Sequence, residues 1–243
     1  MPGTGTVEYD SYVTFWYHQL HMKLLLTSGG LSNESIIKAL FELTKKKASS
    51  LSVAFIPTAS NVETGDKGWL IKDLVQLQAL GFQAISIVDI SAVSEEVWRP
   101  QLEAADEIFA EGGNTFHLMR WIKRSGLAKL LPEFLKTKVY IGASAGSMIF
   151  SKDLVLRLSQ ELYGEDMNEQ KDIKALGLVD FYFLPHLNSK HNKNLRTDTI
   201  QKCAQEMKIK IYALDDQSAL KVTDDKVEII SEGKYLKLGE NLF

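Results

Sequence analysis

The chain has 243 residues, of which 45% are hydrophobic and 24% are charged, and its formal net charge is -3. These proportions are ordinary for a folded globular protein of one α/β domain or two small ones. The slightly acidic balance argues against a nucleic-acid-binding protein, because such proteins normally carry a basic surface. The single cysteine, Cys203, excludes a disulfide framework within the chain and favours a reducing compartment, so we expect a cytoplasmic protein.

Residues 1–21 differ in composition from the rest of the chain. They are rich in aromatic residues, glycine and threonine, and they lack both the positively charged start of a signal peptide and the continuous apolar segment of a membrane span. The segment MKLLLTSGG, which begins at Met22 and contains the first expected strand, is a conventional start for such a domain. We therefore interpret 1–21 as an N-terminal extension, either upstream sequence, a disordered segment or an arm packed on the surface, and 22–243 as one α/β domain without a membrane partner.

From Met22 onward, apolar segments with β-strand composition alternate with longer segments of helical periodicity. The alternation predicts a mostly parallel sheet with helices on both faces, a three-layer α/β fold. The expected strands are 23–27, 52–56, 84–88, 107–110, 139–142 and 178–184, and the expected helices are 34–43, 68–80, 115–123, 144–150 and 194–207. The C-terminal region consists of short apolar segments separated by Asp-rich turns, which predicts antiparallel strands that complete the sheet.

The segment GASAG, residues 142–146, lies where an expected strand becomes a helix. A G-x-S-x-G turn in this position is the nucleophile elbow of serine hydrolases. The small neighbours allow a sharp turn, so Ser144 Oγ would project above the sheet at a helix N-terminus, and the N–H of Ala145 would be placed to donate to an oxyanion. A capping serine in a tight turn is the alternative interpretation.

The segment EGGNTF, residues 111–116, also follows an expected strand. Two glycines at the carboxyl end of a strand let backbone N–H groups face a ligand directly. Gly113 N–H would then be a second oxyanion donor, and Asn114 is a candidate for capping the next helix and for binding substrate. A glycine-rich turn with a capping asparagine is the alternative. We expect His117, one turn into that helix, to be a packing or surface residue.

The third segment, FLPHLN, places His186 at the end of an apolar strand. A histidine at a strand tip is positioned to act as a general base, and Pro185 keeps the residue before it extended. His191 lies in a polar stretch and is a weaker candidate. Because sites in open α/β sheets form at the carboxyl ends of the strands, we expect the three segments to meet there.

A histidine base also needs an acid to orient its imidazole. The stretch KDLVLRLSQELYGED, residues 152–166, lies between Ser144 and His186 and offers four carboxylates without favouring one of them: Asp153, Glu161, Glu165 and Asp166. The sequence contains no HExxH motif and no clustered His or Cys ligands, so we expect no metal site.

Taken in order, the segments GGNTF, GASAGS and VDFYFLPH resemble peptidase family S51, which includes dipeptidase E (α-aspartyl dipeptidase) and its relative cyanophycinase. The resemblance extends from about Met22 to the C-terminal strands. It implies a fold similar to that of class I glutamine amidotransferases, with a serine where those enzymes carry a cysteine. It also implies a Ser-His-acid hydrolase that acts on short peptides without a metal or cofactor.

The resemblance also implies roles for individual residues. Ser144 matches the family nucleophile, His186 matches the histidine of its PH motif, and Gly113 and Ala145 match the oxyanion donors. Arg196 is similar to an arginine that holds the side chain of the substrate's N-terminal aspartate, and a guanidinium is suited to pairing with a carboxylate. A solvated helix arginine is the alternative interpretation.

The third member of the triad departs from the family pattern. Dipeptidase E carries an aspartate shortly after the elbow, and direct counting places Ser159 at that position. Glu161 is the nearest carboxylate and is therefore the expected acid. Asp216, in the segment LDDQSAL, is the reserve.

The function expected from these features is a serine dipeptidase, a monomer or homodimer, that prefers an N-terminal aspartate and forms an acyl-enzyme intermediate. Two alternatives remain open. The first is cyanophycinase-like hydrolysis of β-aspartyl-arginine units, against which the basic residues Lys190, Lys193 and Arg196 argue. The second is a binding protein that keeps the amidotransferase-like shape without turnover.

Overall fold

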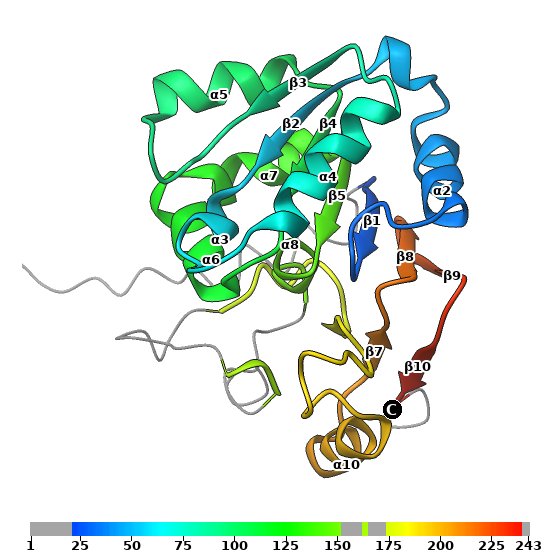
Figure 1. Cartoon of the computed structure of the whole chain (residues 1–243). Helices are drawn as coiled ribbons and strands as arrows, with labels where there is room; N and C mark the ends of the chain where they lie inside the picture. The colour runs from blue at the N-terminus through cyan, green and yellow to red at the C-terminus, as the bar shows by residue number, and fades with distance from the viewer. Residues whose placement is uncertain (1–20, 152–161, 165–173, 240–243) are drawn as a thin grey trace, which may run out of the picture.

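The computed structural model describes residues 21–151, 162–164 and 174–239, and its α/β fold contains two sheets (Figure 1). The larger sheet has seven strands in the order β3-β2-β4-β5-β1-β8-β9, and the smaller sheet has the order β10-β7-β6. The strands of the larger sheet are β1 (Lys23–Thr27), β2 (Ser52–Ile56), β3 (Ala84–Ile87), β4 (Glu107–Ala110), β5 (Val139–Ala143), β8 (Ser218–Thr223) and β9 (Lys226–Ser231). Those of the smaller sheet are β6 (Tyr182–Leu184), β7 (Ile211–Leu214) and β10 (Tyr235–Leu238).

Helices cover both faces of the larger sheet, as the alternating pattern predicts. One face packs against α2 (Glu34–Thr44) and α4 (Gly68–Ala79). The other face packs against α5 (Glu95–Ala104), α6 (Thr115–Arg124), α7 (Leu127–Leu135) and α8 (Ala145–Met148). Two short elements lie in connections, η2 (Ala48–Ser50) and α3 (Thr58–Asn61), and α10 (Thr197–Met207) packs against the smaller sheet in the lower part of Figure 1.

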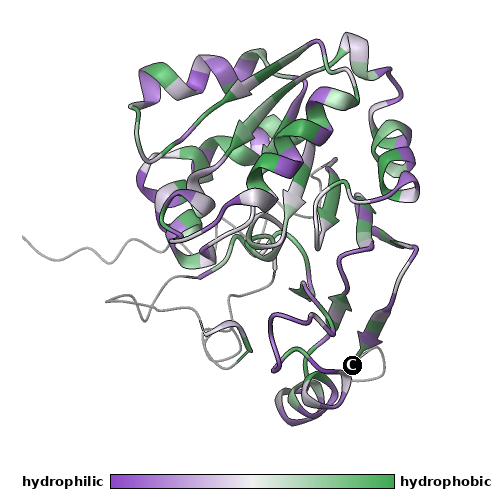
Figure 2. Cartoon of the chain, viewed as in Figure 1, coloured by the Kyte–Doolittle hydropathy of each residue, from purple (hydrophilic) through white to green (hydrophobic). Residues whose placement is uncertain are grey.

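The two faces have separate hydrophobic cores because successive side chains of a strand point in opposite directions. In β1, Leu24 and Leu26 belong to the core that contains Trp98, whereas Leu25 belongs to the core that contains Ile36. Burial of each such side chain stabilises the fold by about 1.5–3 kcal/mol. Figure 2 shows hydrophobic residues on the central strands and hydrophilic residues along α5.

Strands β1 to β5 pair in parallel, so their carboxyl ends lie along one edge of the sheet. This arrangement confirms the predicted mostly parallel α/β sheet. β8 pairs antiparallel with β1, and β9 pairs antiparallel with β8. The prediction that antiparallel C-terminal strands complete the sheet is therefore confirmed only in part. β8 and β9 join the larger sheet, whereas β7 and β10 pair with each other in the smaller sheet.

Two of the longer helices are absent from the elements that the sequence pattern predicts, and both contain a proline. α5 contains Pro100 and buries only Trp98 and Leu102, so its apolar periodicity is weak. α7 contains Pro132 but buries four apolar side chains: Leu127, Leu131, Phe134 and Leu135. Tertiary burial thus outweighs a local signal that normally ends a helix. Among the described residues, no helix is long and apolar enough to cross a membrane.

Candidate active site

The elbow around Ser144 has the strained backbone that its sequence predicts. Ser144 stands between β5 and α8 with φ 47° and ψ −107°, outside the regions favoured by residues with a side chain. Its N–H donates to the carbonyl of Thr27 at 3.0 Å, which ties the turn to the end of β1. The hydroxyl of Thr27 donates to the carbonyl of Gly142 at 2.7 Å, so both strands hold the elbow in place.

Both glycines of the elbow are required by close backbone approach. A Cβ on Gly142 would lie 2.7 Å from the carbonyl of Gly146, and a Cβ on Gly146 would overlap the carbonyl of Ala110 in β4. The turn therefore lies directly against the two neighbouring strands. Tyr140 adds a further restraint, because its buried hydroxyl donates to the Gly146 carbonyl at 2.8 Å.

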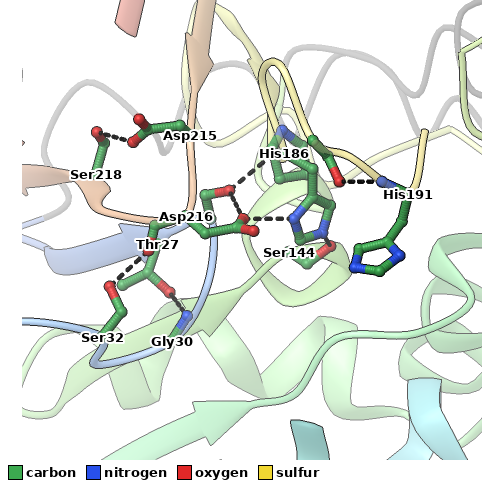
Figure 3. A network of polar contacts seen from close by, with 12 residues as sticks. Thr27, Gly30, Ser32, Ser144, His186, His191, Asp215, Asp216 and Ser218 are labelled. Carbon is green, nitrogen blue, oxygen red and sulfur yellow. Dashed lines mark hydrogen bonds and ion pairs between the residues drawn. The ribbon is translucent and has the colours of Figure 1, made fainter. Parts of the chain in front are cut away.

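The structure brings Ser144 and His186 together across the edge of the sheet (Figure 3). Ser144 Oγ lies 2.8 Å from Nε2 of His186, the distance of a hydrogen bond between a nucleophile and its base. His186 follows β6 with φ 64°, and its backbone N–H donates to Ser28 Oγ at 2.8 Å. His186 is therefore held both through its backbone N–H and through its imidazole ring.

Asp216 supplies the carboxylate on the other ring nitrogen. His186 Nδ1 lies 2.6 Å from Asp216 Oδ1, and Ser28 Oγ donates to the same oxygen at 2.8 Å (Figure 3). Burial raises the pKa of the Asp216 carboxyl, but the hydrogen bonds from His186 and Ser28 outweigh it, so the pKa lies below its usual value. An ionised carboxylate in this position fixes the imidazole tautomer with its acceptor nitrogen toward the serine hydroxyl.

The acids expected from the local sequence fall outside the described part of the chain. Glu161 and the other three candidates, Asp153, Glu165 and Asp166, all lie in segments 152–161 and 165–173. Among the described residues, the carboxylate within hydrogen-bonding distance of His186 is that of Asp216, the reserve candidate.

Both predicted oxyanion donors lie beside the nucleophile. Ala145 is the first residue of α8, so no carbonyl of that helix precedes its N–H. Gly113 lines the same cavity as Ser144 with φ 126°, and a Cβ there would overlap the carbonyl of Ala59, so only glycine fits the position. Gly112 is equally close, because a Cβ on it would lie 3.3 Å from Ser144 Cβ.

Other predicted site residues lie away from the nucleophile. Asn114 caps α6, its side chain accepting from the His117 N–H at 2.8 Å, and it is not among the residues that line the cavity. Arg196 is not among them either, and its Nη1 donates to the carbonyls of Ser189, Asn192 and Leu195 at 2.9–3.2 Å. The guanidinium thus supports the loop before α10.

Two further histidines, His117 and His191, and the cysteine, Cys203, were also considered from the sequence. His191 is exposed, and its backbone N–H donates to Ser189 Oγ at 3.2 Å. His117 is half-buried in α6, where burial first and the charge of Arg120 second lower the pKa of its imidazole. Cys203 lies in α10, as its sequence context predicts. Within the described segments, no three His, Cys, Asp or Glu side chains cluster as metal ligands would.

A cavity of about 520 Å³ opens above Ser144 at the carboxyl edge of the sheet. It is lined by the catalytic candidates Ser144, His186 and Asp216, and by the glycine-rich turns that follow β1 and β4. Charged side chains also line it: Glu63, Lys72, Asp73 and Glu111. Among the described residues of the lining, Lys72 is the only lysine or arginine.

Sequence reasoning missed Ser28 and the charged lining of the cavity. Ser28 had a detectable signal, because the segment TSGG, residues 27–30, ends β1 in the same way as the other two motifs end their strands. Gly29 is required there, since a Cβ on it would lie 2.8 Å from Asp216 Cβ. Lys72 and Asp73 lie in the middle of α4, where the local pattern carries no signal of a site.

Comparison with protein families and curated proteins relates the chain to peptidases. The model of peptidase family S51 matches residues 24–230. The uncharacterized peptidase Lin0382 of Listeria innocua is 32% identical over 184 residues, which cover 72% of this chain and 82% of the relative. Peptidase E of Streptomyces coelicolor is 28% identical over 138 residues, which cover 54% of this chain and 55% of the relative.

Solved structures show the same architecture. A crystal structure of a Listeria monocytogenes EGD-e protein provisionally named peptidase E superposes with a TM-score of 0.72 at 30% identity, covering 88% of this chain and 100% of that chain. A peptidase from an acI-B1 actinobacterium superposes with a TM-score of 0.61 at 19% identity, covering 93% of this chain and 98% of that chain, and supports the fold alone.

Proposed function

Because the chain belongs to peptidase family S51, we propose that it is a serine peptidase that hydrolyses short peptides through a Ser144–His186–Asp216 triad. The contact chain from Ser144 Oγ to His186 Nε2 at 2.8 Å and from Nδ1 to Asp216 at 2.6 Å carries the proposal. A non-catalytic binding protein would not need a serine with a strained backbone to lie within hydrogen-bonding distance of an oriented imidazole. We propose a cytoplasmic location, for which the single cysteine is the support.

The geometry supports a two-step reaction. Ser144 Oγ attacks the scissile carbonyl carbon while His186 accepts the hydroxyl proton, and the N–H groups of Gly113 and Ala145 stabilise the oxyanion. The imidazolium then gives its proton to the leaving amine, which leaves an ester between substrate and Ser144. Water deprotonated by His186 hydrolyses the ester and restores the enzyme. Asp216 remains ionised throughout and stabilises the imidazolium.

Dipeptides are the substrates that suit the site best. The cavity of about 520 Å³ lies within the range of sites for small ligands. Preference for an N-terminal aspartate belongs to the proposal as well. Among the described residues that line the cavity, Lys72 is the cation that could pair with the aspartate side chain of the substrate. The guanidinium of Arg196 is instead bonded to its own loop.

A reactivity experiment tests the nucleophile. A fluorophosphonate probe should label the wild-type protein at Ser144, and Ser144→Ala should abolish both labelling and peptide hydrolysis. Ser32→Ala is the matched control for labelling, since Ser32 also lines the cavity but bonds to the Asp216 backbone carbonyl at 2.6 Å rather than to His186. Hydrolysis at the normal rate by folded Ser144→Ala would reject the serine mechanism.

A substrate panel tests the specificity. We expect Asp-Leu to be cleaved faster than Asn-Leu, and both faster than a β-aspartyl-arginine dipeptide. The cyanophycinase-like alternative stays in the panel because Glu63, Asp73 and Glu111 give the cavity carboxylates that a guanidinium could use. Faster cleavage of the β-aspartyl-arginine substrate would replace the dipeptidase assignment with that alternative.

A further inference from the structure

Two carboxyl groups at the wall of the cavity have no function in the triad. Glu111 ends β4 and is 1% exposed, although it belongs to the cavity lining. Its Oε1 accepts the N–H of Gly112 at 2.8 Å, whereas Oε2 has no hydrogen-bond partner in the described part of the chain. The neighbouring polar group is the carboxyl of Asp73 in α4, which lies within hydrogen-bonding reach but can donate only when protonated.

A buried pair of this kind is costly unless a cation or a shared proton compensates it. Burial raises the pKa of both carboxyls, and the charge of Asp73 raises that of Glu111 further, while Lys72 and the Gly112 N–H act in the opposite direction. The pair thus retains a proton that a cationic ligand could displace. Two neighbouring acceptor groups suit an ammonium, which has three N–H donors.

Glu111 is adjacent in the chain to a glycine that lies beside the nucleophile. Gly112 follows Glu111 directly, and a Cβ on Gly112 would lie 3.9 Å from Ser144 Oγ. On the other side, the Asp73 carboxyl packs against Gly30, where a Cβ would lie 2.6 Å from Oδ2. Gly30 belongs to the turn whose Ser28 bonds to Asp216 and His186.

We propose that the carboxyl pair of Asp73 and Glu111 binds the α-ammonium group of the peptide and thereby selects substrates with a free N-terminus. The inference rests on the proposed peptidase function. In a dipeptide, the α-nitrogen is two bonds from the scissile carbonyl carbon, and one residue spans about 3.8 Å. A group that holds the α-ammonium must therefore lie in the same cavity as the nucleophile, and Glu111 lines that cavity one position before Gly112, which lies beside Ser144.

Matched substrates isolate the ammonium. Ala-Leu and propionyl-Leu differ only in the α-ammonium group, so the ratio of their kcat/KM values measures its contribution. We expect the wild type to prefer Ala-Leu, and Glu111→Gln and Asp73→Asn each to lower kcat/KM for Ala-Leu by roughly ten- to a hundredfold, mainly through KM. The same variants should leave propionyl-Leu nearly unchanged. An equal loss on both substrates, or no loss on either, would overturn the proposal.

Glu107→Gln is the control variant. Glu107 is a second buried glutamate of β4, at the end of the strand remote from the cavity, so it reports the effect of removing a buried acid without touching the site. Glu107→Gln should keep the wild-type ratio of kcat/KM for Ala-Leu to kcat/KM for propionyl-Leu. N-acetyl-Lys-Leu distinguishes the source of the ammonium: if it is cleaved as well as Ala-Leu and loses that activity in Glu111→Gln, the pair reads a basic side chain and the α-ammonium assignment is wrong.

Binding to Ser144→Ala separates the inference from the proposed function. Calorimetry on this variant should detect Ala-Leu but much weaker binding of propionyl-Leu, and adding Glu111→Gln should remove the difference. Because no turnover is needed, this result holds whether or not Ser144 attacks a peptide. Failure of fluorophosphonate labelling would reject the serine mechanism alone, whereas equal binding of the two compounds would reject the ammonium site alone.

Discussion

At the scale of single residues, Asp216 is the carboxylate that lies within hydrogen-bonding distance of His186 in the described part of the chain. The carboxylate accepts from His186 Nδ1 at 2.6 Å and from Ser28 at 2.8 Å, although 53% of its side chain is exposed. Water on the exposed side and the two hydrogen bonds both favour the ionised carboxylate, whereas burial of the rest of the group opposes ionisation. Ser28 connects this acid to the backbone of His186 and therefore positions two members of the triad at once.

We predict that Asp216→Asn lowers kcat by about three to four orders of magnitude, because an amide can donate to Nδ1 and select the wrong imidazole tautomer. Glu161→Gln should have a much smaller effect. Steady-state kinetics on Ala-Leu, with circular dichroism to verify folding, would measure both. A severe loss in Glu161→Gln with a mild loss in Asp216→Asn would return the third position to Glu161.

A second residue-scale prediction concerns recognition of an N-terminal aspartate. Lys72→Met keeps most of the stem of the side chain and removes the charge, so it should lower kcat/KM for Asp-Leu by about tenfold or more and leave Asn-Leu nearly unchanged. Arg196→Met should act on both substrates alike, because its guanidinium bonds to loop carbonyls. A selective loss on Asp-Leu in Arg196→Met would show instead that the arginine reaches the substrate.

At the scale of elements, a buried glutamate lies at each end of β4: Glu107 is its first residue, and Glu111 directly follows its last residue, Ala110. Glu111 faces the cavity at the carboxyl end. Glu107 is 0% exposed at the other end, and neither of its carboxylate oxygens has a hydrogen-bond partner in the described residues. Burial first, and then the charge of Asp106, raise the pKa of Glu107 to about 8.

This raised pKa predicts a pH dependence of stability. The folded protein retains the Glu107 proton up to about pH 8, whereas the unfolded chain releases it near the ordinary value of 4.5. The stability associated with Glu107 is therefore complete below pH 4.5 and is lost as the pH rises toward 8, with a slope of at most about 1.4 kcal/mol per pH unit. Between pH 6 and pH 8.5, the free energy of unfolding measured with urea should change less in Glu107→Gln than in the wild type. An unchanged difference would mean that another group titrates.

At the scale of the whole molecule, the triad depends on how the two sheets join. Asp216 lies in the turn between β7 of the smaller sheet and β8 of the larger sheet. The preceding residue, Asp215, holds that turn: Oδ1 accepts from the Gln217 N–H at 3.1 Å and from Ser218 Oγ at 2.7 Å, and its N–H donates to the Lys234 carbonyl at 3.0 Å. The position of the catalytic carboxylate is thus set by the junction between the sheets.

We predict that Asp215→Ala lowers kcat by about tenfold or more with little change in KM, because it removes hydrogen bonds worth about 0.5–1.5 kcal/mol each from the turn that carries Asp216. Asp215→Asn keeps an acceptor and should recover part of the loss. Asp225→Ala, in the exposed β8–β9 turn, is the control and should behave as the wild type. If kcat were normal in Asp215→Ala, the turn would not position the triad.

Local chemistry made the meeting of Ser144 and His186 predictable from the sequence. Gly142 and Gly146 flank Ser144 because the turn lies against neighbouring backbone, and that steric requirement is recorded in the residue types themselves. His186 was predictable because it ends an apolar strand, and parallel strands present their carboxyl ends at one edge. The alternation of strands and helices likewise determined the α/β class before any contact was known.

Only the tertiary structure decided which charged residues join that site. Asp216 is 30 residues beyond His186 and reaches it because β7 runs parallel to β6 and the chain then enters β8, antiparallel to β1. Lys72 and Asp73 belong to a helix whose local pattern gives no sign of a cavity. Hydrogen bonds form over distances of about 3 Å, and the sequence fixes such distances only between close neighbours, whereas sheet pairing fixes them between remote segments.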